Sequence, residues 1–223
     1  MRNVTHIGIL MLLVLGASCS STPAPDEALS TPEGAVVTWF ESIDAGDVEA
    51  ASEAIHPESL ALILAIENDI SIEKLADHLS NGVPLNLQSS YWQSFSLGFT
   101  DFASKPISTL SVGQAERFVS EGEDFASVPI SGGPGSDSVV IARMRADGTW
   151  EVDMVASLGD GFSKLLLDRY DELGSGAAAT RVRLAYVEVV APSMWAAMTD
   201  GSFGDSFART ALTILDRIAE DAN

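Results

Sequence analysis

The chain has 223 residues, of which 32 are acidic and 12 are lysine or arginine, so its formal net charge is −20 at pH 7. A field of that sign repels nucleic acid and anionic lipid headgroups, which argues against nucleic-acid binding and against a polybasic membrane patch. Hydrophobic residues make up 46% of the chain and the mean hydropathy is +0.19, values typical of a folded protein.

The N-terminus predicts an export signal. Arg2 precedes an uninterrupted apolar stretch, residues 7–15, and small residues then stand directly before Cys19, the only cysteine. The apolar stretch is too short to span a membrane, as in secretory signal peptides. The small residues before Cys19 resemble the lipobox of bacterial lipoproteins, although Gly16 stands where that pattern prefers an aliphatic residue. An ordinary secretory signal with an incidental cysteine is the alternative.

The resemblance implies that residues 1–18 are removed and that the thiol of Cys19 is lipidated. The protein would then be lipid-anchored on the extracytoplasmic side of a bacterial cell membrane. One acyl chain anchors only marginally, so stable attachment requires the several chains that lipoproteins carry. Residues 20–30 are small and polar and include prolines. Residues 19–30 are therefore expected to be a lipidated cysteine and a flexible tether.

Helix signals begin after the tether. Thr31, Pro32 and Glu33 predict a helix start, because they supply an N-cap oxygen, a proline at the first helical position and an early acid. Gly46 ends this helix, and Asp47 predicts the cap of a short second helix. The further segments are an apolar stretch over 60–66, a helix from Ser71 to Leu79, and a helix over 91–102, where the spacing of the aromatic residues favours a helix over a strand.

Strand signals follow residue 106. Strands are expected over 107–119, 125–130, 138–145 and 149–155, with hairpin turns at 121–123 and at Asp147-Gly148. In the last strand, alternation places Trp150, Val152 and Met154 on one face and Thr149, Glu151 and Asp153 on the other. The pattern predicts an antiparallel sheet with one packed face and one wet face.

The C-terminal part reads as helical again. Helices are expected over 162–173, 177–198 and 206–222, with Pro192 bending the second of them. The glycine-serine stretch 174–176 is the predicted internal boundary. Residues 175–223 would then form a C-terminal helical extension.

Two segments carry a family resemblance. TPEGAVVTWFESIDAGDVEAASEAIHPES (31–59) and ADGTWEVD (146–153) resemble the opening helices and the closing hairpin of the nuclear transport factor 2-like superfamily. The resemblance implies an α+β domain over residues 31–174, in which N-terminal helices pack on a bent, cone-like antiparallel sheet. The opening of such a cone can hold an apolar ligand. The same scaffold carries enzymes, binding modules and pure scaffolds, so it assigns no function.

We expect no catalytic, cofactor-binding or metal-ligating residue in this chain. His56 stands before Pro57, where a cap or a solvent contact is the simplest interpretation. His78 shares its helix with Glu73, Lys74 and Asp77, which predicts a solvated face. The histidines have no metal-ligand spacing, and no zinc-protease motif or nucleophile elbow occurs. Enzymes of the superfamily use an acid/base pair inside the cone, but no residue here matches such a motif.

Three other features have compositions found in binding sites. The glycine-rich stretch 131–136 joins two strands and lacks a lysine, so it predicts a hairpin loop and not a phosphate site. The acidic stretches 121–124 and Asp160-Gly161 do not fit a calcium loop. The aromatic residues of 91–102 are either core or pocket lining. These four residues are Trp92, Phe95, Phe99 and Phe102.

The sequence therefore predicts a membrane-anchored lipoprotein whose domain binds a small apolar ligand or an envelope protein without catalysis. One alternative is an isomerase or dehydratase with a carboxylate base. A second is a spacer with a filled core. A cavity with a buried carboxylate facing a histidine would favour the enzyme, and a dry cavity would favour the binding module.

Overall fold

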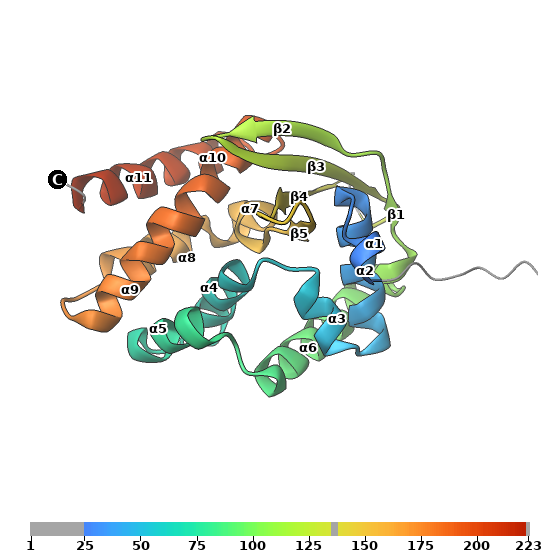
Figure 1. Ribbon diagram of the computed structural model, residues 1–223, viewed down its shortest axis with the longest axis horizontal. Helices are drawn as coiled ribbons and strands as arrows, with labels where there is room; N and C mark the ends of the chain where they lie inside the picture. Colours follow the sequence, from blue (N-terminus) through green and yellow to red (C-terminus); the bar gives the residue numbers. More distant parts are fainter. Residues whose placement is uncertain (1–24, 135–137, 222–223) are drawn as a thin grey trace, which may run out of the picture.

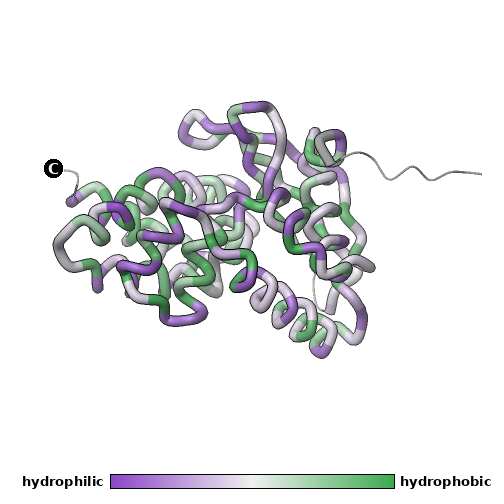
Figure 2. The backbone as a smooth tube through the Cα atoms, turned by 60° about the horizontal axis from the view of Figure 1, so that its bottom comes forward, coloured by the Kyte–Doolittle hydropathy of each residue, from purple (hydrophilic) through white to green (hydrophobic). Residues whose placement is uncertain are grey.

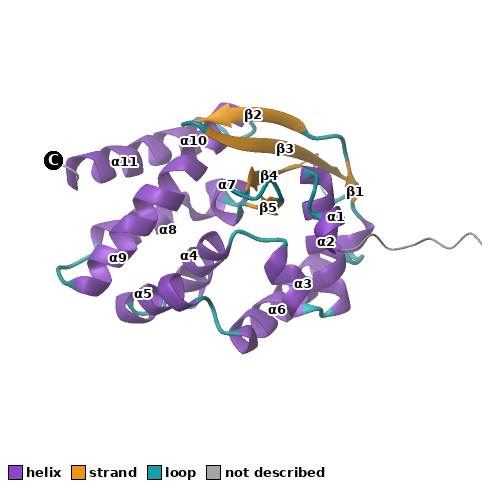
Figure 3. Ribbon diagram, viewed as in Figure 1, coloured by secondary structure: helices purple, strands orange, loops and turns teal. Residues whose placement is uncertain are grey.

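The computed structural model describes residues 25–134 and 138–221. The predicted signal peptide, Cys19 and the first part of the tether lie outside these residues. The fold is α+β, with one curled antiparallel sheet of half-barrel form and many helices (Figure 3). The helices of residues 159–221 lie at the opposite end of the molecule from the helices of residues 25–53 (Figure 1). Within the described residues, no helix combines the length and apolarity that crossing a membrane requires.

The N-terminal helices are α1 (Pro25–Ala28), α2 (Pro32–Ala45), α3 (Val48–Glu53) and α4 (Pro57–Glu67). The predicted caps are confirmed: Thr31 Oγ1 accepts a hydrogen bond from the Gly34 N–H at 3.0 Å, and Asp47 Oδ1 accepts from the Ala50 N–H at 3.1 Å. Gly46 ends α2 with φ of 71°, a left-handed conformation that favours glycine.

Part of the predicted tether is packed. The side chain of Leu29 is buried, and its carbonyl accepts a hydrogen bond from the Trp150 N–H at 2.7 Å. Leu29, in the segment predicted to be a tether, therefore belongs to the hydrophobic core.

Two more helices precede the sheet, α5 (Ile72–Asn81) and α6 (Leu85–Ala103). The preference for a helix over residues 91–102 is confirmed, and the helix begins earlier, at Leu85. Only Gln88, Tyr91 and Trp92 of α6 are buried, so this helix lies across the surface of the fold.

The sheet contains β1 (Ser111–Val112), β2 (Glu116–Ser120), β3 (Glu123–Ser131), β4 (Ser138–Met144) and β5 (Trp150–Val152). Strands β1 and β2 both pair with β3, which pairs with β4, which pairs with β5, all antiparallel. The β2–β3 turn, Glu121-Gly122, has φ of 51° and 84°, and the Asp147-Gly148 turn joins β4 to β5. Both predicted hairpins are confirmed.

The single strand predicted over 107–119 is wrong. This segment contains the 3₁₀ turn η1 (Ile107–Thr109) and two short strands separated at Gly113–Ala115. At the break, the Ala115 N–H donates to Glu33 Oε1 at 2.7 Å, so a side chain of α2 takes a backbone donor from the edge of the sheet. The interruption therefore depends on a contact between segments far apart in sequence.

The strand predicted over 149–155 is also shorter, and its wet face is wrong. It ends at Val152, because Asp153 caps α7 (Met154–Ser157) by accepting from the Ala156 N–H at 2.9 Å. Glu151 is 4% exposed and Asp153 is 0% exposed. All three residues of β5 are buried. The chain between α3 and α4 pairs with the edge of the strand at Val152, and α10 (Ala191–Asp200) lies against Asp153.

The C-terminal helices are α8 (Gly159–Asp171), α9 (Ala177–Ala185), α10 (Ala191–Asp200) and α11 (Asp205–Asp221), with the π-helical turn η2 (Tyr186–Val190) between α9 and α10. The π turn stands directly before Pro192, which has no N–H to donate to the Glu188 carbonyl four residues earlier. That carbonyl accepts instead from Arg143 Nη2 at 3.4 Å.

One hydrophobic core joins both sides of the predicted 174–176 boundary. In the part of the molecule near the C-terminus, hydrophobic and hydrophilic residues alternate along the tube (Figure 2). Helices α9, α10 and α11 each bury several apolar side chains. Their apolar side chains are continuous with those of α2, α4 and the sheet. Residues 177–221 therefore supply part of the core that holds the sheet. The core members from these helices include Val182, Tyr186, Met194, Phe207 and Ile214.

Candidate functional site

A partly buried charge cluster lies between β4, β5 and the N-terminus of α4. It consists of His56, Arg143, Arg145 and Glu151. Arg145 Nε donates to Glu151 Oε2 at 2.5 Å, and its Nη2 donates to the Glu53 carbonyl at 2.6 Å. Arg143 forms an ion pair with Glu123 at 2.5 Å. The cluster therefore ties the sheet to the end of α3 through charged groups.

His56 caps α4 and stays neutral. Its Nδ1 accepts from the Ser59 N–H at 3.1 Å, which leaves the proton of the neutral ring on Nε2. Burial, Arg143 and Arg145 lower the pKa of His56 to about 3. Its Nε2 lies 3.8 Å from Glu151 Oε1, too far for a hydrogen bond. The prediction of a capping histidine is confirmed, and the carboxylate that faces it was not foreseen.

Asp153 adds a second buried carboxylate beside this cluster. Its Oδ1 accepts from the Ala156 N–H, and its Oδ2 accepts from Ser193 Oγ of α10 at 2.6 Å. Burial raises the pKa of both Glu151 and Asp153. Sequence alternation placed both acids on a wet face, so it missed them as buried titratable groups.

The contacts of the cluster favour a structural role. General acid–base chemistry needs a group within hydrogen-bonding reach of a substrate. Here Glu151 is paired with Arg145, Asp153 is a helix cap, and His56 uses Nδ1 as a cap. None of them lines the pockets described below. The acid and the histidine face each other, but within packed protein.

An apolar pocket of about 280 Å³ lies between α2, α6 and the β3–β4 end of the sheet. Its lining contains five aromatic rings and no ionisable side chain. The hydroxyl of Ser157, one of its few polar groups, is already bonded to the Ile141 and Asp153 backbone. The aromatic residues of the lining are Trp39, Phe40, Phe95, Phe99 and Phe102.

The predicted aromatic group is divided by the structure. Phe95, Phe99 and Phe102 line the apolar pocket, and the Phe102 side chain is 74% exposed. Trp92 is 2% exposed and belongs to the core. Both interpretations left open by the sequence are therefore correct, each for part of the group.

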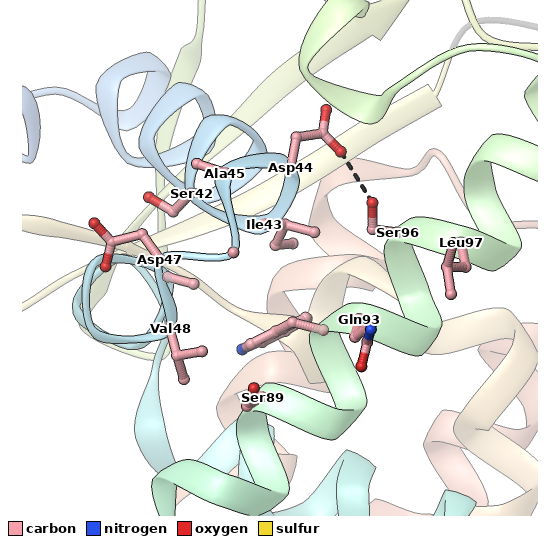
Figure 4. A pocket seen from close by; sticks show the side chains of 13 residues that line it. Ser42, Ile43, Asp44, Ala45, Asp47, Val48, Ser89, Gln93, Ser96 and Leu97 are labelled. Atoms are coloured by element: carbon pink, nitrogen blue, oxygen red, sulfur yellow. Dashed lines mark hydrogen bonds between the residues drawn. The ribbon is translucent and has the colours of Figure 1, made fainter.

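A polar pocket of about 380 Å³ lies between the α2–α3 turn and α6 (Figure 4). Asp44 points toward Ser96, whose hydroxyl donates to Asp44 Oδ1 at 3.1 Å, and Asp44 Oδ2 accepts from the Ser108 N–H at 2.8 Å. Asp47 is the cap of α3. Both carboxylates of this pocket therefore hold the backbone or a neighbouring helix in place.

His78 is not on a solvated face, and that prediction is wrong. His78 is 3% exposed, and burial lowers the pKa of its imidazole. It lies on the same face of α5 as Leu75 and Leu79, which pack against α4 and α9. The charged residues next to His78 in the sequence suggested an exposed position. The three-residue spacing from Leu75 to His78, which places both on one face of the helix, was the signal for burial.

The remaining candidates show no site. Glu123 of the 121–124 stretch is paired with Arg143, and the glycine-rich stretch joins β3 to β4, as predicted for a hairpin loop. Residues 135–137 and the side chain of Asp160 lie outside the described part of the structure. Across 25–134 and 138–221, no three His, Cys, Asp or Glu residues gather as metal ligands.

Comparisons with known protein families, with curated proteins and with solved structures find no match to this chain.

Proposed function

We propose that this protein is a lipid-anchored extracytoplasmic binding module that takes a small apolar ligand without catalysis. The apolar pocket carries the proposal. It presents aromatic rings from α2 and α6 and no ionisable group, which suits binding and offers nothing for proton transfer. The nuclear transport factor 2-like resemblance supports the proposal, because an opening at one end of a cone-like sheet is where that fold holds ligands.

The energetics support an apolar occupant. Phe102 leaves most of its ring in water, and Phe95 and Phe99 are half-buried. Covering apolar surface contributes about 25 cal/mol per Å². A ligand that covers these rings therefore gains free energy that the unliganded protein lacks. Helix α6, which supplies all three, contributes few buried side chains to the core and can adjust at low cost.

One observation favours an enzyme as the second candidate. Glu151 is a buried carboxylate with a raised pKa, and it faces His56 at 3.8 Å. An isomerase or dehydratase would use such a carboxylate as its base. Arg145 binds this carboxylate directly, and a cation so placed weakens it as a base. The binding module is therefore the stronger proposal.

The pocket is tested with the neutral fluorescent probe N-phenyl-1-naphthylamine. Phe99→Gln should weaken probe binding at least tenfold, about 1.4 kcal/mol, because it puts an amide into an apolar wall. Leu212→Gln, at a 47% exposed position on α11 that does not line this pocket, should leave the affinity unchanged. Equal probe affinity for the wild-type protein and Phe99→Gln would refute this pocket as the binding site.

The anchor is tested at Cys19. In a bacterial host, Cys19→Ala should abolish incorporation of labelled fatty acid and release the protein from membranes, because the chain has no other cysteine. Ser20→Ala, which keeps the thiol, should retain both label and membrane attachment. Label that persists on Cys19→Ala would rule out lipidation at this residue.

A further inference from the structure

A third pocket, called here the acceptor pocket, encloses about 240 Å³ between α4, α5 and the first half of α6. It is distinct from the apolar pocket, with which it shares no lining residue. Apolar side chains form much of its wall, and polar side chains are grouped within it. The polar residues of its lining are Glu67, Asn68, His78, Ser90, Tyr91 and Ser94.

Two polar atoms of this lining are buried and have no partner in the described structure. They are Nδ1 of His78 and Oη of Tyr91, and the two residues are 3% and 9% exposed. A buried polar atom without a hydrogen bond costs about 1–3 kcal/mol, and native proteins keep few of them. Both atoms belong to residues that line this pocket, and a polar occupant that displaced the lining slightly would give them a partner.

The other polar groups of the lining offer mainly acceptors. Ser90, Ser94 and Asn68 each donate to the carbonyl four residues earlier on their own helix, at 3.0, 2.9 and 2.9 Å. The hydroxyl protons of Ser90 and Ser94 are thereby used, Asn68 keeps one N–H, and oxygen lone pairs remain on all three. No lysine or arginine lines the pocket. An occupant that carries hydrogen-bond donors therefore suits this lining.

Glu67 gives the pocket its charge. The residue is exposed, its carboxylate has no ion pair or hydrogen bond among the described residues, and partial desolvation raises its pKa. It lies close enough to Tyr91 to raise the pKa of that phenol, after the larger effect of burial. An anion would be repelled here, whereas a cation would offset the desolvation of the carboxylate.

We propose that the acceptor pocket binds a small aliphatic amine in its ammonium form. Glu67 is the counterion, and the lone pairs of Ser90, Ser94 and Asn68 accept the ammonium protons. The alkyl part packs against Leu64, Ile70 and Leu87, which line the same pocket. His78 Nδ1 and Tyr91 Oη are covered from solvent, so the amine reaches them with a small displacement of the lining.

The charge of the ligand is tested with three probes of equal alkyl length. Isothermal titration of the wild-type mature protein at pH 7 with n-butylamine should show saturable binding, whereas butyrate should not bind. 1-Butanol should bind at least tenfold more weakly than the amine, since it lacks the charge. Glu67→Gln should weaken amine binding at least tenfold. Binding of butyrate, or an amine affinity unchanged in Glu67→Gln, would overturn the proposal.

A second variant separates binding from folding. Tyr91→Phe removes a buried hydroxyl that has no partner, so it should keep or raise the Tm while it weakens n-butylamine binding several-fold. If Tyr91 had only a structural role, Tyr91→Phe would not keep or raise the Tm while it weakened amine binding. Phe99→Gln, in the apolar pocket, should leave amine binding unchanged. The two binding proposals can therefore be refuted separately. Unchanged amine binding by Tyr91→Phe would contradict a role for Tyr91 in this site.

Discussion

Replacing Tyr186 by alanine should lower the free energy of unfolding by about 4 kcal/mol. Its side chain is 0% exposed, its ring centre lies 4.8 Å from that of Tyr170, and its hydroxyl donates to the Leu166 carbonyl at 2.7 Å. The substitution leaves a cavity and also an unpaired buried carbonyl. Urea denaturation should show a lower midpoint with an unchanged m-value.

Two control variants divide this effect. Tyr186→Phe removes only the hydrogen bond and should cost about 1 kcal/mol. Leu212→Ala, at an exposed position on α11, should change stability by less than about 0.5 kcal/mol.

A chain that ends at residue 174 should not unfold cooperatively, because its core loses the side chains of α9 to α11. Cooperative unfolding of the shortened chain would instead show that residues 175–223 are an independent extension.

The second large effect concerns pH. His56 has an ordinary pKa near 6.5, which falls to about 3 in the folded protein. Between these values the unfolded chain binds a proton that the folded protein does not, so stability falls as the pH falls. The loss approaches 1.4 kcal/mol per pH unit below pH 6.5, or about 3 kcal/mol by pH 4. Protonation would place a cation beside Arg143 and Arg145, although Glu151 also faces the ring.

His56→Asn isolates this contribution. Asparagine is a good N-cap and can accept from the Ser59 N–H, but it does not titrate. Glu151 and Asp153 have raised pKa values, so their protonation adds stability as the pH falls. This contribution is present in both proteins and is removed when the two are subtracted. The wild-type free energy of unfolding minus that of His56→Asn should therefore decrease steadily from pH 6.5 to pH 4. A difference that stays constant with pH would show that His56 is not held neutral.

Much of the local structure followed from the sequence alone. The caps at Thr31 and Asp47, the glycine that ends α2, and both hairpin turns lie where their residues predicted. Each depends on hydrogen bonds or backbone conformations within about four residues. Neighbours in sequence therefore contain the information that these features require.

The sequence misplaced the polar residues whose surroundings come from distant segments. Glu151 and Asp153 look like the wet side of a strand, but the chain before α4 covers one and α10 covers the other. His78 sits among charged neighbours along α5, yet its face of the helix is packed. The strand expected over 107–119 is interrupted where Glu33 of α2 binds its backbone.

The apolar pocket and the acceptor pocket were also decided by tertiary structure. The spacing of Phe95, Phe99 and Phe102 indicated one face of a helix, but only the approach of α2 and the sheet left a space beside it. The acceptor pocket joins α4, α5 and α6 across turns whose angles no local pattern specifies. Helix starts, helix ends and hairpins are encoded by adjacent residues, whereas burial, pKa shifts and cavities depend on how those elements pack against one another.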